Sequence, residues 1–209
     1  MRVRTEINYL NCQKLLQTHY SIIPLLHYSN WGEAPKFIYT NSNHKYFNCG
    51  SMSSKVLKLQ DLIRTVQDLR ESGKNIVFTN GCFDILHVGH VRYLTAARLE
   101  GDVLVVGVNS DESVRSIKPK NRPIVNQDQR AEVLAGLECV DYITVFNEPD
   151  PLILIQALKP DVLVKGADWS EEEIIGADVV KANGGKVVRV SAVPEVSTSR
   201  IIQRIIKRY

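Results

Sequence analysis

Several features are scarce in this sequence of 209 residues, and each absence excludes a class of protein. No apolar run reaches 18 residues, so no membrane span is expected. The four cysteines form neither a CxxC pair nor a zinc spacing, which argues against a disulfide framework and favours a reducing, cytoplasmic compartment. The sequence also lacks the basic, apolar and small-residue pattern of a secretory signal.

The net charge is small and unevenly distributed. The whole surplus of +3 lies in residues 1–51, because residues 52–209 carry 21 basic and 21 acidic side chains. Binding to nucleic acid requires a surplus of cations that neutralise phosphates. A neutral body therefore argues against nucleic acid as a partner, and any anionic ligand must be held by a local site.

Residues 1–51 differ in composition from the rest of the chain. They hold eight of the fifteen aromatic residues and three of the five histidines, without a sustained helical or strand period. We expect an N-terminal extension, 1–51, that is disordered or loosely docked, followed by a single domain, 52–209. Two other interpretations stay open: an arm that binds a partner, and translation from an upstream codon with Met52 as the natural start.

The pattern of the domain predicts its fold. Short apolar runs of the kind buried in parallel sheets occur at residues 75–79, 103–108, 142–146, 162–164 and 186–190. Helical patterns lie around them at about 57–71, 90–100, 126 onward, 150–158, 171–183 and 197–205. This alternation predicts an open, doubly wound, Rossmann-like α/β domain, a five-stranded parallel sheet with helices on both faces. Ligands of such sheets bind at the carboxyl ends of the strands.

The segment after the first predicted strand, residues 79–90, contains neither a P-loop nor a GxGxxG motif. It places His87 and His90, the only histidines of residues 52–209, at the start of a helix. A helix N-terminus attracts anions, and imidazoles there can donate hydrogen bonds to phosphoryl oxygens. Gly89 between them permits close approach of a phosphate or ribose. The alternatives are a pair that only caps or packs, and a zinc site, for which further ligands are missing.

Residues 81–90, Gly-Cys-Phe-Asp-Ile-Leu-His-Val-Gly-His, resemble the HxGH signature of the cytidylyltransferase-like nucleotidyltransferases. The resemblance covers residues 75–206 and includes the segments 108–112, 115–123, 165–169 and 197–199. Within the family it is strongest to D-glycero-β-D-manno-heptose 1-phosphate adenylyltransferases, which occur alone or as the C-terminal half of a bifunctional protein. It implies that a sugar 1-phosphate attacks the α-phosphorus of ATP and that pyrophosphate leaves. The alternatives are a cytidylyltransferase that uses CTP and glycerol 3-phosphate, and a nucleotide-binding regulator without turnover.

The resemblance assigns roles to individual residues. We expect His87, His90 and Lys118 to be catalytic, the histidines as donors to phosphate oxygens and the lysine as a bridge between the two phosphates. The residues expected to bind the nucleotide are Asn80, Gly81, Cys82, Phe83, Asp84, Gly89, Asn109, Lys165, Gly166, Asp168, Ser197, Thr198 and Ser199. The residues expected at the substrate phosphate are Lys120, Arg122 and Arg130.

Some of these assignments keep an alternative. Asp84 could brace its loop instead of a ribose hydroxyl, Ser197, Thr198 and Ser199 could simply cap a helix, and Arg130 could pair with a surface carboxylate. We expect Mg²⁺ to arrive with the triphosphate and no metal site built by the protein. The resemblance further implies a homo-oligomer, a dimer or larger.

Overall fold

The computed structural model describes residues 38–39, 47–48, 54–191 and 196–209. The chain divides into two units, Met1–Lys36 and Phe37–Tyr209, and the first of them lies outside the described residues. Of the expected extension, the structure describes one antiparallel pair, β1 (Ile38–Tyr39) and β2 (Phe47–Asn48). The expected state of residues 1–51 and the boundary at residue 52 stay predictions.

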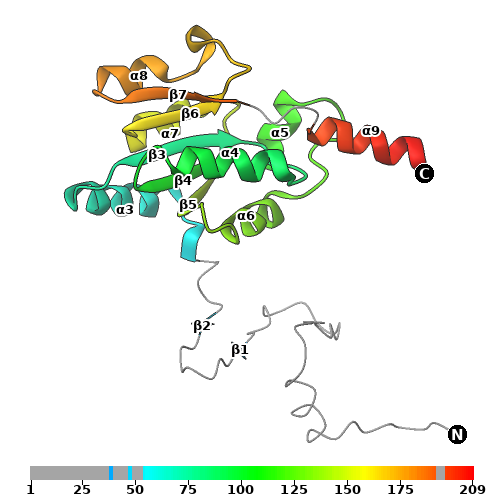
Figure 1. The fold of residues 1–209 in the computed structure, drawn as a ribbon, viewed down its shortest axis with the longest axis horizontal. Helices are drawn as coiled ribbons and strands as arrows, with labels where there is room; N and C mark the ends of the chain where they lie inside the picture. Colours follow the sequence, from blue (N-terminus) through cyan, green and yellow to red (C-terminus); the bar gives the residue numbers. More distant parts are fainter. Residues whose placement is uncertain (1–37, 40–46, 49–53, 192–195) are drawn as a thin grey trace, which may run out of the picture. The chain divides into compact units, whose positions relative to one another are not determined.

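A five-stranded parallel sheet forms the centre of the domain (Figure 1). Its strands are β3 (Ile76–Gly81), β4 (Val103–Asn109), β5 (Tyr142–Phe146), β6 (Val162–Gly166) and β7 (Lys186–Val190). They lie in the order β5-β4-β3-β6-β7 and pair in parallel throughout. The chain moves outward from β3 to β5 and then returns to the other side of β3, so the strand order reverses between β3 and β6. The predicted strands and fold class are confirmed.

Six of the helices match the predicted helical patterns, although the one predicted over residues 171–183 is shorter than expected. They are α3 (Leu59–Glu71), α4 (Val88–Arg98), α6 (Gln127–Ala135), α7 (Leu152–Leu158), α8 (Ala177–Ala182) and α9 (Thr198–Arg208). The predicted cap at Asn126 is confirmed, because its side chain accepts a hydrogen bond from the Gln129 amide at 2.9 Å.

The structure differs from the predicted pattern in two places. A seven-residue helix, α5 (Asp111–Ile117), follows β4 and was not predicted, because only two of its residues, Val114 and Ile117, are apolar and they form no clear period. Its start is fixed by the hydroxyl of Ser110, which accepts a hydrogen bond from the Ser113 amide at 3.1 Å. The single helix expected over 171–183 is instead a short 3₁₀ turn, η2 (Glu171–Glu173), and α8, because Gly176 between them has a φ of +84°.

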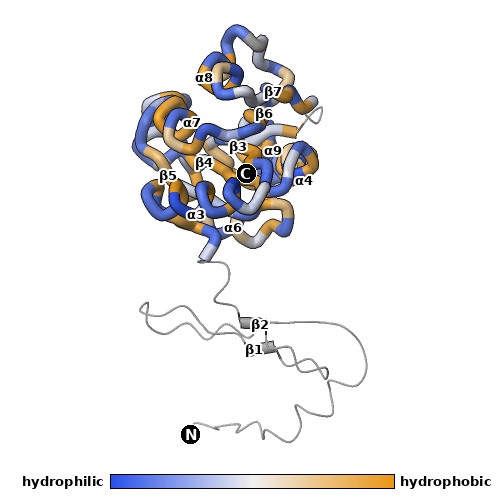
Figure 2. The backbone as a smooth tube through the Cα atoms, turned by 90° about the vertical axis from the view of Figure 1, so that its left-hand side faces the viewer, coloured by the Kyte–Doolittle hydropathy of each residue, from blue (hydrophilic) through white to orange (hydrophobic). Residues whose placement is uncertain are grey.

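Side chains that alternate along the strands form a core on each face of the sheet. Ile76 and Phe78 of β3 pack with α3, α7 and α8, whereas Val77 packs with α4 and α6. All seven residues of β4 are buried, as expected for a strand covered on both sides. Figure 2 shows the hydrophobic colour concentrated along these central strands. Helices therefore cover both faces, as predicted.

The α4 helix offers a direct test of this packing. Leu94 is 0% exposed in the core between α4 and the sheet, whereas Leu99, just past the end of α4, is 81% exposed. We expect Leu94→Ala to lower the free energy of unfolding by about 2–5 kcal/mol, because it leaves a cavity in a close-packed core. Leu99→Ala should change it by no more than about 0.5 kcal/mol. Urea unfolding measures both, and equal losses would contradict the described packing.

Candidate functional site

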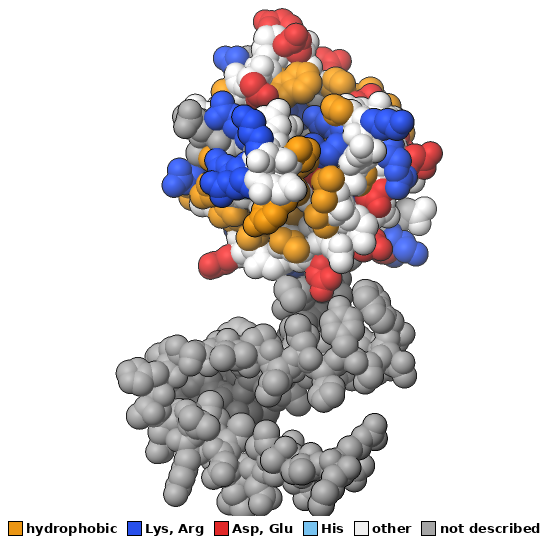
Figure 3. Space-filling view, turned by 90° about the vertical axis from the view of Figure 1, so that its right-hand side faces the viewer, with side chains coloured by type: hydrophobic (Ala, Val, Ile, Leu, Met, Phe, Trp, Pro, Cys, Tyr) orange, Lys and Arg blue, Asp and Glu red, His pale blue; other side chains and the backbone are white. Residues whose placement is uncertain are grey.

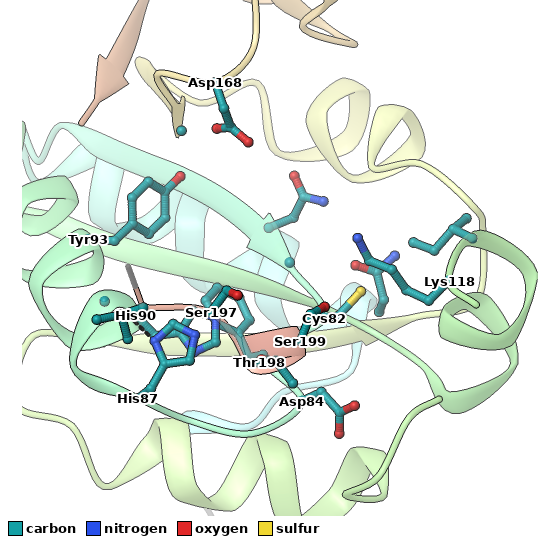
Figure 4. Close-up of a pocket in the computed structure, with 18 of the residues that line it drawn as sticks. Cys82, Asp84, His87, His90, Tyr93, Lys118, Asp168, Ser197, Thr198 and Ser199 are labelled. Carbon is teal, nitrogen blue, oxygen red and sulfur yellow. Dashed lines mark hydrogen bonds between the residues drawn. The ribbon is translucent and has the colours of Figure 1, made fainter. Parts of the chain in front are cut away.

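A pocket of about 600 Å³ opens at the carboxyl ends of β3 and β6, where the strand order reverses (Figure 4). Its walls come from the β3–α4 loop, the first turn of α4, the segment after α5, the end of β6 and the N-terminus of α9. All the residues predicted to be catalytic or to bind the nucleotide line this pocket, and so does Arg122. The topology thus brings together segments that lie more than 100 residues apart in the sequence.

The two histidines lie at the tip of α4. His87 is the N-cap residue, and its Nδ1 accepts a long hydrogen bond of 3.4 Å from the amide of His90. The two rings stack with centroids 3.8 Å apart and planes 15° apart, and the edge of Phe83 meets His90 with a centroid distance of 5.2 Å. Figure 4 shows Lys118 on the other side of the pocket from this pair. The pair is therefore held rigidly at the positive end of a helix.

Burial keeps both imidazoles neutral near pH 7. Burial lowers the pKa of His90 to about 4, and the nearby His87 adds to the shift. Burial also lowers the pKa of His87, against the effect of a backbone hydrogen bond. The Nδ1 atom of His90 is buried and has no hydrogen-bond partner among the described residues. A neutral imidazole keeps one N–H donor, so this pair can donate to phosphate oxygens without a permanent buried charge.

The pKa of His90 can be measured directly. In the free protein we expect its imidazole to stay neutral down to pH about 4, because burial disfavours the cation. The folded-state pKa lies below the ordinary 6.5, so this group favours the folded state above pH 6.5 and progressively less as the pH falls toward 4. A ¹⁵N NMR titration, with His90→Asn to assign the resonance, measures it. An apparent pKa of 6.5 or higher would contradict this environment.

Asp84 braces the loop that follows α5. Its carboxylate pairs with the guanidinium of Arg122 and accepts hydrogen bonds from the amides of Ile124 and Val125, both at 2.8 Å. Burial alone would raise the pKa of Asp84, but these amides and the guanidinium outweigh it and lower the pKa. Of the two roles expected for Asp84, the structure shows that of a loop brace. Arg122 reaches the pocket wall, but its guanidinium is already paired.

Two of the expected substrate-phosphate residues do not line the pocket. The side chain of Arg130 is 0% exposed, and its guanidinium donates to Asp111 and Val125 at 2.8 and 2.9 Å and to the carbonyl of Cys82. The expectations of a substrate contact and of a surface ion pair for Arg130 are therefore both corrected: it ties α5 and α6 to the β3–α4 loop from inside the protein. Lys120 is exposed and lies outside the pocket wall.

The strand ends at the reversal point are linked across the pocket floor. Lys165, at the end of β6, donates a hydrogen bond to the side chain of Asn80, at the end of β3. The hydroxyl of Tyr93 on α4 is 2.7 Å from that of Thr79 and donates to the carbonyl of Val164 at 3.0 Å. Burial raises the pKa of Tyr93 to about 12, so this hydroxyl keeps its proton. Sequence reasoning missed Tyr93, although its spacing of three residues from His90 places it on the same face of α4.

The N-terminus of α9 closes another side of the pocket. Ser197 caps this helix by accepting a hydrogen bond from the Arg200 amide at 3.2 Å, which confirms the capping role. Thr198 and Ser199 also line the pocket, so the first amides of α9 meet the same space as the tip of α4. The α9 helix carries basic residues and no acidic one, and Figure 3 shows groups of Lys and Arg side chains on the side of the domain toward which α9 points. None of the basic residues of α9 lines the pocket, so the contribution of this helix to an anion site is its first amides.

Three further observations concern the thiol on the pocket wall, metal binding and membrane spans. Burial raises the pKa of the Cys82 thiol, so it remains protonated and serves as a packing residue. Across the described ranges, no group of three or more His, Cys, Asp or Glu side chains lies close enough to hold a metal ion. In the same ranges no helix is both long and apolar enough to cross a membrane.

The family of the chain follows from the comparisons with known proteins. Residues 78–204 match the family model described as Cytidylyltransferase-like, and the chain belongs to this family. The resemblance inferred from the HxGH motif is thereby confirmed, and with it the class of nucleotidyltransferases.

Two relatives and one crystal structure are similar to large parts of this chain. The chain is 49% identical over 154 residues to "Bifunctional protein HldE" of Syntrophotalea carbinolica, covering 73% of this chain and 31% of that protein. It is 48% identical over 163 residues to the protein of the same name from Geobacter metallireducens, covering 78% and 33%. The chain thus spans about a third of the length of these relatives. A crystal structure of the lipopolysaccharide core biosynthesis protein from Thermoplasma volcanium is similar with a TM-score of 0.51 and 32% identity, covering 58% of this chain and 99% of that one.

The buried ion pair of Asp84 leads to a stability prediction. Asp84→Asn should lower the free energy of unfolding by about 3 kcal/mol at pH 7, because it leaves the half-buried guanidinium of Arg122 without a counter-charge. The pKa of Asp84 in the folded state lies below its ordinary value of 3.8. The stabilisation by this carboxylate is therefore complete above pH 3.8 and is lost as the pH falls from there through the folded-state pKa. The penalty should therefore shrink between pH 7 and pH 3 in urea unfolding.

Asp61→Asn provides the matched control. Asp61 pairs with Arg64 on the surface, where the two side chains are 54% and 75% exposed. Its replacement should cost at most about 1 kcal/mol. Equal penalties for the two variants would show that Asp84 is not a buried brace.

Proposed function

We propose that this chain transfers an adenylyl group from ATP to D-glycero-β-D-manno-heptose 1-phosphate, giving ADP-heptose and pyrophosphate, for the synthesis of surface glycan precursors. Membership of the cytidylyltransferase-like family supports the reaction class. Identity of about 48–49% to two proteins named HldE supports the particular substrates, as does the similarity to a lipopolysaccharide core biosynthesis protein. The observation that carries the proposal is the stacked, neutral histidine pair in a pocket that two helix N-termini enter.

The reaction needs little covalent work from the protein. An oxygen of the acceptor phosphate forms a bond to the α-phosphorus of ATP, and the bond from that phosphorus to the bridging oxygen breaks as pyrophosphate leaves. In this proposal His87 and His90 donate hydrogen bonds to the phosphate oxygens, and Lys118 neutralises the two phosphates as they approach. The first amides of α9 hold the outer phosphates. The catalytic contribution is positioning and charge stabilisation.

Nucleotidyltransferases generally use a divalent metal ion together with the nucleoside triphosphate. We propose that Mg²⁺ fills this role here, bound mainly by phosphate oxygens and water, as this ion prefers. Such an ion needs no cage of protein carboxylates, and the lining of this pocket offers none among the described residues. When bound, it would neutralise charge on the phosphates of the leaving group.

Two further parts of the proposal concern location and assembly. We propose that the reaction takes place in the cytoplasm, where ATP is available, as the cysteine pattern favours, and that the protein works as a homo-oligomer, as the family resemblance implies. Analytical ultracentrifugation of the full chain measures the assembly state.

Pyrophosphate release with paired substrates tests the function. We expect turnover with ATP and D-glycero-β-D-manno-heptose 1-phosphate, and little with CTP or with glycerol 3-phosphate. Preferential turnover of CTP with glycerol 3-phosphate would replace the proposal by a cytidylyltransferase. Binding of ATP without turnover of any pair would indicate a nucleotide-binding regulator.

The histidine pair can be tested by amide substitutions that preserve the helix start. His87→Asn and His90→Asn should each lower kcat by roughly 10²–10³, the effect of removing one preorganised donor from a developing negative charge. Asparagine is a good N-cap residue, so the first variant should keep α4 intact. Thr95→Asn, an exposed change on the same helix, is the control and should leave kcat near that of the wild type. Wild-type rates in the double histidine variant would overturn the mechanism.

A further inference from the structure

A second cavity, of about 260 Å³, adjoins the main pocket. The two cavities share wall residues at the ends of β3, β4 and β6 and just after α5, namely Asn80, Asn109, Ile117, Lys118, Lys165 and Trp169. The remaining wall of the smaller cavity comes from residues 149–151, before α7, and residues 173–175, before α8. Neither of these two segments contains a residue that the sequence predicted for the site.

The linings of the two cavities suit different ligands. The larger cavity holds the tips of α4 and α9, whose first amides suit an anion, whereas the smaller one is lined by neither of these tips but by the segment before the short helix α7. The larger cavity also has two carboxylates, Asp84 and Asp168, but Asp84 is paired with Arg122. The smaller cavity contributes Asp150 and Glu173, whose oxygens can accept hydrogen bonds from the hydroxyl groups of a ligand.

We propose that the smaller cavity binds the polyhydroxylated body of the sugar phosphate acceptor, with the acceptor's phosphate at Lys118 and Lys165 on the wall that the two cavities share. This inference rests on the proposed function. It places the two reacting phosphates at the boundary between the cavities, with the nucleotide in the larger one. It also replaces Lys120, Arg122 and Arg130 as the expected phosphate ligands, since Lys120 lies elsewhere and the two arginines are held in internal ion pairs.

Local hydrogen bonds fix both carboxylates in place. Asp150 Oδ1 accepts from the amide of Leu152 at 2.9 Å, at the start of α7. Glu173 Oε2 accepts from the hydroxyl and the amide of Ser170 at 2.9 and 3.2 Å. Ile174 and Ile175 add an apolar wall that suits the C–H faces of a sugar ring. Fixed acceptors beside an apolar wall are the features by which a pocket orients a polar small molecule.

Lys165 has surroundings that suit a phosphate ligand. Its ammonium donates to Asn80, and burial lowers its pKa to about 8 although the charge of Asp150 opposes the shift. A phosphate that enters would stabilise the ammonium form and raise that pKa. Lys118, which is exposed, also lines both cavities. The ammonium groups of Lys118 and Lys165 can therefore bind the same acceptor phosphate.

A larger side chain placed in the smaller cavity tests the inference. Ile175 lines only that cavity and is 44% exposed, so Ile175→Trp should fold normally and occupy the sugar space. We expect KM for heptose 1-phosphate to rise on the order of tenfold or more, while KM for ATP stays within about twofold. The control is Ile153→Trp on α7, because Ile153 is 49% exposed and lines neither cavity. It should match the wild type in both constants.

A second variant probes the hydroxyl contacts without changing the volume. Asp150→Asn keeps an oxygen for the Leu152 amide but removes the charge, and it should raise KM for the sugar phosphate with little change in ATP binding. An active wild type whose acceptor KM is unchanged in both variants would overturn the inference and leave the proposed function standing. A rise in KM for ATP alone would place the nucleotide in the smaller cavity and overturn it as well. A wild type that does not turn over this substrate pair would overturn both proposals.

Discussion

The reversal of strand order between β3 and β6 is the constraint on which the site depends. The connection from β3 leads to β4 on one side and the connection from β6 leads to β7 on the other, so the two leave in different directions. The space between them is where the tip of α4, the start of α9 and the segment after α5 can meet one ligand. The bond from Lys165 to Asn80 and the hydroxyl of Tyr93 hold the two strand ends together at this point.

In the proposed function, the histidine pair would bind a highly charged ligand without carrying a large charge of its own. Stacked imidazoles 3.8 Å apart repel each other if both are cations, and burial already favours the neutral forms. The positive potential comes instead from helix ends, which need no desolvated ion. Negative charge that develops on a bound triphosphate would then strengthen hydrogen bonds that are already oriented.

The basic residues of the domain serve two distinct purposes. Arg122 pairs with Asp84 and fixes the loop after α5 against the β3–α4 loop, whereas Arg130 pairs with Asp111 and ties α6 to α5. Lys118, in the same region of sequence, stays exposed on the pocket wall. The ion pairs thus position the loop that presents the lysine, so the stability of the loop and the chemistry of the site are linked through Asp84.

The sequence by itself determined the strands, most of the helices and the motif at the first strand end, because short apolar runs and the spacing of His87 and His90 are local features. It also indicated the residues that line the pocket. Only the tertiary structure decided which cations face the ligand, since burial of Arg130 depends on Asp111, 19 residues away, and on the Cys82 carbonyl, 48 residues away. It likewise revealed Tyr93 and the second cavity, whose walls join the ends of β3, β4 and β6 with the segments before α7 and α8, which no local pattern connects.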